Sequence, residues 1–123
     1  VEGEEKFRTR EIEVFSDLFN KDNCVISTGG GVVLAEINRE LLKKGTVLYL
    51  KTSIQTQLER TMNDKDRPLL SGKNNKENIL RNIAKIRNPL YEELSTFIIE
   101  ETDNPNQTVD SILDILGKNK WKS

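Results

Sequence analysis

The alternation of helical and strand patterns along the chain limits its fold more than any other feature. Apolar side chains recur at helical spacing across Glu4–Phe19, and a short apolar run follows at Cys24–Thr28. The next helical pattern ends near the basic, glycine-terminated stretch Lys43-Lys44-Gly45. Strand patterns return at Thr46–Leu50 and Thr96–Ile99. Strands that alternate with helices predict an α/β fold with a parallel sheet.

Three further helices are predicted between and after these strands. Ser53 is a suitable N-cap for a helix that runs to about Met62. A long helix is expected from about Glu77, interrupted near Asn88-Pro89, and the last helix is expected to start at Thr108 as its N-cap. We expect two apolar faces to be buried: Ile79, Ile83 and Ile86 on the long helix, and Val109, Ile112, Leu113 and Leu116 on the last one. Because three strands are few for this class, part of the domain is expected to be missing from the chain.

Composition excludes several classes of function. Lys and Arg total 19 against 20 Asp and Glu, so the chain lacks the basic excess of a nucleic-acid-binding protein. No apolar run approaches the roughly 18 residues that span a bilayer, and the charged N-terminal stretch has no signal-peptide core. Without histidine, zinc sites and histidine-based triads are excluded. The single cysteine, Cys24, suits a reducing cytoplasm, and we expect it to be a small core residue.

Residues 63–76, NDKDRPLLSGKNNK, are dense in charge, Asn, Gly and Pro, and are expected to form a mobile loop with the weakest packing in the chain. Arg67 lies within this loop, and Pro68 stiffens the backbone beside it. A loop with one such arginine can close over an anionic ligand and exclude water. The alternative for any single arginine is an ordinary solvated cation.

Thr28-Gly29-Gly30-Gly31 stands at the predicted carboxyl end of a strand, where ligands bind in open α/β sheets. Three successive glycines expose backbone N–H groups that a ligand can approach closely. A flexible strand-to-helix turn is the alternative interpretation. Arg87 lies beside the predicted helix interruption at Asn88-Pro89, where its side chain can be aimed at a ligand.

Taken together, five motifs resemble the shikimate kinase family. In chain order they are Glu2-Gly3-Glu4-Glu5, Phe7-Arg8 with Glu11, Thr28-Gly29-Gly30-Gly31, Arg67-Pro68-Leu69-Leu70 and Arg87-Asn88-Pro89-Leu90-Tyr91. Their order and spacing agree along almost the whole chain, and only Trp121-Lys122-Ser123 is unmatched. Each element alone is common, but the combination is specific.

The resemblance implies a P-loop kinase with three layers that transfers the γ-phosphoryl of ATP to the 3-hydroxyl of shikimate. Arg8 and Arg87 match the residues that hold the shikimate carboxylate. Gly29, Gly30 and Gly31 match the backbone that lines the shikimate ring. Glu11 matches an acidic residue that orients the arginine. We therefore expect Arg8 and Arg87 to converge beside these glycines.

On the nucleotide side, the resemblance assigns Arg67 to the lid, where it reaches the transferred phosphate. Arg60 matches the residue that lies against adenine, and the turn from Asp103 to Gln107 lies near the other adenine face. ATP and magnesium are the implied cofactors, shikimate and ATP the partners, and a cytoplasmic monomer the usual state. The resemblance implies no nucleic-acid partner and no membrane partner, and it assigns no metal ligand to the residues of this chain.

The sequence departs from the family pattern in one large respect. The phosphate loop G-x-x-G-x-G-K-[ST] appears nowhere in it, and the Asp-x-Asp segment that precedes the position of Gly3 in the family has no counterpart. We therefore expect residues 1–123 to be a single partial kinase domain that lacks the phosphate-loop strand and its neighbour and is inactive alone. In the family this strand lies between the strands ending at Thr28 and Leu50, so we expect a slot or altered pairing there.

Two alternatives remain open. Another small-molecule kinase, such as a gluconate kinase, shares the general fold, although the glycine and Arg87-Asn88-Pro89-Leu90-Tyr91 motifs argue against it. A non-catalytic remnant or a partner-binding fragment of a P-loop kinase is the other.

Overall fold

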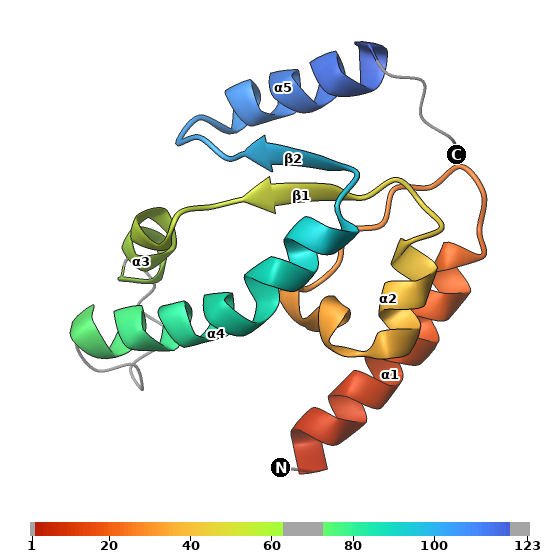
Figure 1. Cartoon of the computed structure of the whole chain (residues 1–123), viewed down its shortest axis with the longest axis horizontal. Coiled ribbons are helices and arrows are strands. Elements are labelled where there is room, and N and C mark those ends of the chain that lie inside the picture. Colours follow the sequence, from red (N-terminus) through yellow and green to blue (C-terminus); the bar gives the residue numbers. More distant parts are fainter. Residues whose placement is uncertain (1, 63–72, 119–123) are drawn as a thin grey trace.

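The computed structural model describes residues 2–62 and 73–118. Helices and one short 3-10 helix, η1, surround a small sheet (Figure 1). The elements are α1 (Glu2–Phe19), η1 (Gly30–Leu34), α2 (Glu36–Leu42), β1 (Leu48–Lys51), α3 (Ile54–Met62), α4 (Lys73–Leu94), β2 (Phe97–Glu100) and α5 (Pro105–Lys118). Within these ranges, no helix combines the length and the apolar character needed to cross a membrane.

The two strands pair in parallel, with Leu48 opposite Phe97 and Lys51 opposite Glu100. The backbone N–H of Glu101 donates to the carbonyl of Lys51 at 2.9 Å and extends the ladder by one bond. Helix α5 runs along β2, and α3 and α4 lie on the side of β1 (Figure 1). The predicted α/β class with a parallel sheet is confirmed.

The main core forms where η1 meets three helices. Val32 and Val33 are only 4% and 3% exposed and pack with Phe15 of α1, Leu42 of α2 and Leu94 of α4. Burying an aliphatic side chain of this size contributes about 1.5–3 kcal/mol. The residues immediately before Val32 are therefore held at a defined position between α1 and α4.

Side-chain caps mark the starts of α3 and α5. The cap of α3 was predicted correctly, and that of α5 was not. The Ser53 hydroxyl accepts the N–H of Thr56 at 3.1 Å, which confirms Ser53 as the cap of α3. The cap predicted at Thr108 is wrong. Asn104 accepts the N–H of Asn106 at 2.9 Å, and Pro105 occupies the first helical position, where its missing N–H is not needed.

Two predictions about α4 are also wrong. The helix continues through Pro89 without interruption. It starts at Lys73, so the last residues of the predicted loop 63–76 are helical. Residues 63–72, Arg67 among them, lie outside the described residues, and the prediction of weak packing there stays a prediction.

The apolar faces predicted to be inward are largely exposed. Ile79 and Ile83 are each 39% exposed and Ile86 is 65% exposed, and on α5 Val109 and Leu113 are 50% and 61% exposed. Ile112 and Leu116 are half-buried. For the exposed residues the predictions are wrong because helical periodicity identifies an apolar face but does not supply an element that covers it. Of the described segments, none packs closely enough on these side chains to bury them.

The predicted buried strand at Cys24–Thr28 is wrong as well. The segment is extended, but it pairs with neither of the two strands that make up the sheet in the described residues. Val25 is 94% exposed, and Cys24, which we expected to be a small core residue, is exposed as well. A strand is buried only when neighbours take up its backbone hydrogen bonds and cover its faces. The segment therefore makes no ladder with β1 among the described residues, and the altered pairing that we expected as one of two outcomes is not observed.

We expect Val25→Lys to reduce self-association of the chain. An exposed apolar residue on an unpaired extended segment is a site for edge-to-edge pairing, and a lysine opposes it. Sedimentation velocity at increasing concentration measures the effect. The urea midpoint should stay nearly the same, because a fully exposed substitution changes stability by about 0.5 kcal/mol or less. Unchanged association in the variant would contradict the prediction.

Candidate functional site

The site is built around Gly29, Gly30 and Gly31, which we call the glycine segment. Gly29 is extended (φ −72°, ψ 160°) and Gly30 opens η1. Gly31 is buried, and Val32 follows it directly into the core. The segment thus joins an extended, exposed stretch of chain to a packed turn.

Helix α1 brings an ion pair to the glycine segment. Arg8 and Glu11 lie one turn apart, and Arg8 Nη1 donates to Glu11 Oε1 at 2.9 Å. A Cβ added at Gly31 would lie 2.6 Å from Arg8 Cζ, and one at Gly29 would lie 3.8 Å from Glu11 Oε2. Both charged groups therefore lie against the glycine backbone, and Arg8 occupies space that only a glycine at position 31 leaves free.

Helix α4 brings two further side chains to the same segment. A Cβ added at Gly30 would lie 3.4 Å from Arg87 Nη1 and 2.9 Å from the Tyr91 hydroxyl oxygen. That hydroxyl donates to the carbonyl of Gly30 at 2.6 Å. The predicted convergence of Arg8 and Arg87 beside the glycines is confirmed.

The charges around the glycine segment favour an anion. Glu11 pairs with Arg8, whereas Arg87 has no ion pair or hydrogen bond with any described residue. Arg8 Nε is buried and likewise has no partner in the described part of the chain. Arg8 also lies 4.0 Å from the exposed carboxylate of Glu4, so the unused donors are Arg8 Nε and the Arg87 guanidinium. Such donors match a planar carboxylate.

Tyr91 is supported from the sheet by a second tyrosine. The ring of Tyr49, on β1, lies 5.0 Å from the Tyr91 ring at an interplanar angle of 42°. Burial raises the pKa of Tyr49 above its ordinary value of 10.0, and the negative charge of Glu92 and the neighbouring Tyr91 raise it further. The neutral hydroxyl is therefore the favoured form of Tyr49 in the folded chain.

Two residues of α2 that the sequence analysis missed fix the turn after the glycines. Asn38 is fully buried, and its Nδ2 donates to the carbonyl of Val32 at 3.0 Å. Arg39 Nη1 donates to the carbonyls of Val33 and Leu34 at 2.8 and 3.0 Å. In the sequence, adjacent Asn and Arg residues in a short helix look like solvated surface residues. No sequence signal therefore indicated that Asn38 and Arg39 bind the backbone of the turn.

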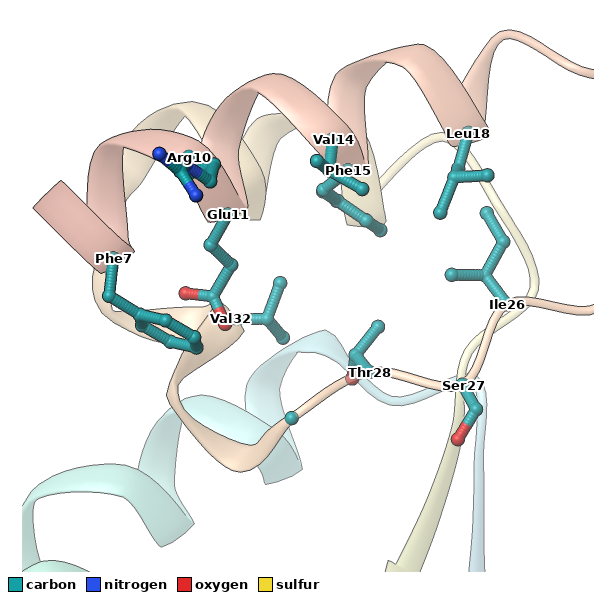
Figure 2. Close-up of a pocket in the computed structure, with 11 residues that line it drawn as sticks. Phe7, Arg10, Glu11, Val14, Phe15, Leu18, Ile26, Ser27, Thr28 and Val32 are labelled. Atoms are coloured by element: carbon teal, nitrogen blue, oxygen red, sulfur yellow. The ribbon is translucent and has the colours of Figure 1, made fainter.

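A cavity of about 280 Å³ lies beside the glycine segment, between α1 and residues 26–32. Figure 2 shows Leu18 and Ile26 facing one another at one end and Glu11 reaching down from α1 toward Val32 at the other. Phe7, Val14 and Phe15 add apolar lining, and Arg10, Ser27 and Thr28 add polar groups. The cavity therefore offers one acidic group, Glu11, in a lining that is mostly apolar but also holds a cation and two hydroxyls.

The residues predicted for the nucleotide side lie elsewhere. Arg60, at the end of α3, pairs with Glu101 just after β2, with 3.4 Å between Nη1 and Oε2. Gln107 is exposed in the first turn of α5 and donates its backbone N–H to the carbonyl of Asn104 at 3.0 Å. Arg60 thus lies at the end of β2 from which the turn to Gln107 departs. Arg67 lies outside the described residues.

Across residues 2–62 and 73–118, no group of three or more Asp, Glu, Cys or His side chains lies close enough together to hold a metal ion. Magnesium in kinase sites is usually held by one or two carboxylates together with the substrate phosphates, so a site of that kind does not need such a group.

Known proteins with similar sequences and structures are shikimate kinases. The family model for shikimate kinase matches residues 1–117. The shikimate kinase of Histophilus somni (strain 2336) is 42% identical over 118 residues, which cover 91% of this chain and 67% of that protein. The shikimate kinase of Buchnera aphidicola subsp. Schizaphis graminum (strain Sg) is 46% identical over 121 residues, covering 96% and 69%.

A solved structure agrees with these sequence matches. The shikimate kinase from Acinetobacter baumannii in complex with shikimate superposes with a TM-score of 0.80 and 41% identity, covering 97% of this chain and 68% of that one. The chain therefore spans about two thirds of the length of these relatives.

We expect Tyr49 to ionise above pH 10.0, in a step that Tyr49→Phe removes from the tyrosinate absorbance titration. Because its folded-state pKa exceeds the unfolded value, the stabilisation from neutral Tyr49 is fully present below pH 10.0 and is lost as pH rises through the folded pKa. Urea midpoints of wild type should fall over that range, and those of Tyr49→Phe should fall less. Equal pH dependence in the two chains would contradict this.

Proposed function

The chain belongs to the shikimate kinase family, and we propose that its described residues form the shikimate-binding part of an enzyme that transfers the γ-phosphoryl of ATP to the 3-hydroxyl of shikimate. The observation that carries the proposal is the convergence of Arg8 and Arg87 on the glycine segment. The solved relative was bound to shikimate, which supports the same ligand here.

In the proposed site, the two arginines hold the shikimate carboxylate. Each guanidinium presents N–H donors in a planar fork that matches two carboxylate oxygens. Glu11 takes one donor of Arg8 at 2.9 Å and thereby orients the rest of the group. Arg87, which has no partner of its own in the described residues, is free to bind the ligand through its whole fork.

The shikimate ring would lie against the glycine segment. Without Cβ atoms, the backbone of Gly29 and Gly30 permits close approach, and both residues are exposed. The cyclic ligand would be held between this backbone and the guanidinium groups. Ring hydroxyls can exchange hydrogen bonds with exposed backbone groups there, which orients the ring.

On the nucleotide side, the proposal keeps Arg67 as the lid residue for the transferred phosphate and Arg60 and Gln107 as residues near adenine. ATP would supply the phosphoryl group, with magnesium as its counter-ion. The sequence holds no phosphate loop, so the β- and γ-phosphates lack their main ligand among residues 1–123. We propose that residues 1–123 are one partial kinase domain of a cytoplasmic, monomeric enzyme.

The shikimate site is tested with a matched pair of glycine substitutions. We expect Gly31→Ala to weaken shikimate binding roughly tenfold or more, because its Cβ would displace the Arg8 guanidinium, which lies within 2.6 Å. Gly117→Ala, on α5 and away from the glycine segment, should bind as the wild type does, because a Cβ added there meets nothing within 4 Å. Isothermal titration of the 123-residue chain with shikimate measures both.

Unfolding midpoints provide the control for this pair, since a loss of binding counts only in a folded variant. The assignment of Arg8 to the ligand carboxylate is contradicted if Gly31→Ala and Gly117→Ala bind shikimate equally well. Failure of the wild-type chain to bind shikimate at millimolar concentration would contradict the proposed site as a whole.

We expect residues 1–123 to show no phosphoryl transfer from ATP to shikimate, because no phosphate loop is present to hold the β- and γ-phosphates. A coupled assay for ADP release measures this, and the Acinetobacter baumannii shikimate kinase serves as the positive control. Shikimate-dependent ADP release by the chain would show that the phosphate loop is dispensable.

A further inference from the structure

Tyr91 contacts the glycine segment by a hydrogen bond that the proposed function does not use. Its hydroxyl donates to the Gly30 carbonyl at 2.6 Å across 61 positions of sequence. Tyr91 stands four residues after Arg87, so both project from the same face of α4. One face of α4 thus supplies Arg87, which is proposed to bind the carboxylate, and Tyr91, which holds the backbone beside it.

We propose that Tyr91 is a positioning residue for shikimate binding: it fixes the orientation of the Gly30–Gly31 peptide relative to Arg87. This proposal rests on the proposed function and deepens it. Tyr91 is argued to act through the glycine backbone and not by contact with the reacting atoms.

The planarity of the peptide bond explains how one hydroxyl can do this. The carbonyl of Gly30 and the N–H of Gly31 belong to one trans peptide unit and point in opposite directions. A hydrogen bond that holds the carbonyl toward Tyr91 therefore turns the Gly31 N–H away from α4. Glycine needs such a constraint more than other residues, because it has the widest choice of backbone conformations.

The hydroxyl itself is held by packing from the sheet. The Tyr49 ring lies 5.0 Å from the Tyr91 ring, and Leu90 and Tyr91 pack against the core cluster that contains Val32 and Leu94. An ion pair between Lys51 and Glu92, 3.6 Å apart, joins the end of β1 to the same turn of α4. The donor is therefore attached to β1, α4 and the core.

A test is provided by Tyr91→Phe, which keeps the ring and deletes only the hydroxyl. Tyr49→Phe is the matched control, because it removes a hydroxyl from the partner ring and leaves the Gly30 bond in place. All chains are measured in the same concentration of sucrose, which favours the folded state of each. The readouts are shikimate affinity by titration and amide solvent-exchange rates at Gly31 and Val32 by NMR.

We expect Tyr91→Phe to weaken shikimate binding about 3- to 10-fold, the range for one neutral hydrogen bond, and to raise exchange at Gly31. Tyr49→Phe should change neither. A full-length family member carrying the equivalent change should show a raised KM for shikimate with kcat and the KM for ATP nearly unchanged.

The two readouts separate the possible failures. Wild-type affinity and wild-type exchange in Tyr91→Phe would overturn the positioning role. Equal losses in Tyr91→Phe and Tyr49→Phe would also overturn it, since general packing would then be the cause. If exchange rises at Gly31 but the wild-type chain binds no shikimate, the clamp on the glycine segment is supported and the proposed function is overturned.

Discussion

The burial of Val32 and Val33 is the constraint on which the candidate site depends. Three consecutive glycines have no side chains of their own to pack, and ordering each backbone residue costs roughly 1–2 kcal/mol. The two valines that follow are almost fully buried between α1, α2 and α4 and contribute about 1.5–3 kcal/mol each. Asn38 holds the carbonyl of Val32, so the turn is fixed by polar contacts as well as by packing.

The two helices that supply the charged groups, α1 and α4, place them in the same way. On α1, Glu11 and Phe15 lie one turn apart, so the face that anchors the helix in the core through Phe15 also presents Glu11 and Arg8 to the glycines. On α4, Leu94 is the core anchor, and Tyr91 and Arg87 follow on its face toward the helix N-terminus. In each helix, burial of one apolar residue sets the direction in which an arginine points.

The parts of the chain that the structure leaves exposed show what local patterns do not decide. Cys24–Thr28 has the composition of a buried strand, and Ile79, Ile83 and Ile86 form an apolar face, yet Val25 and Ile86 are 94% and 65% exposed. Burial depends on a neighbour, and of the described elements none covers these side chains. The chain spans about two thirds of the length of its shikimate kinase relatives.

The sequence by itself determined the order of the long helices and of β1 and β2, the α/β class, the cap at Ser53 and the residue types of the site, because each of these depends on local periodicity or on a motif. It also predicted that Arg8 and Arg87 would meet at the glycine segment, through a family resemblance and not through spacing. Only the tertiary structure decided that Asn38 is fully buried and that Asn104 caps α5. It alone showed the bond from Tyr91 to Gly30, since a contact between residues far apart in the chain depends on how the helices pack and leaves no periodic signal in the sequence.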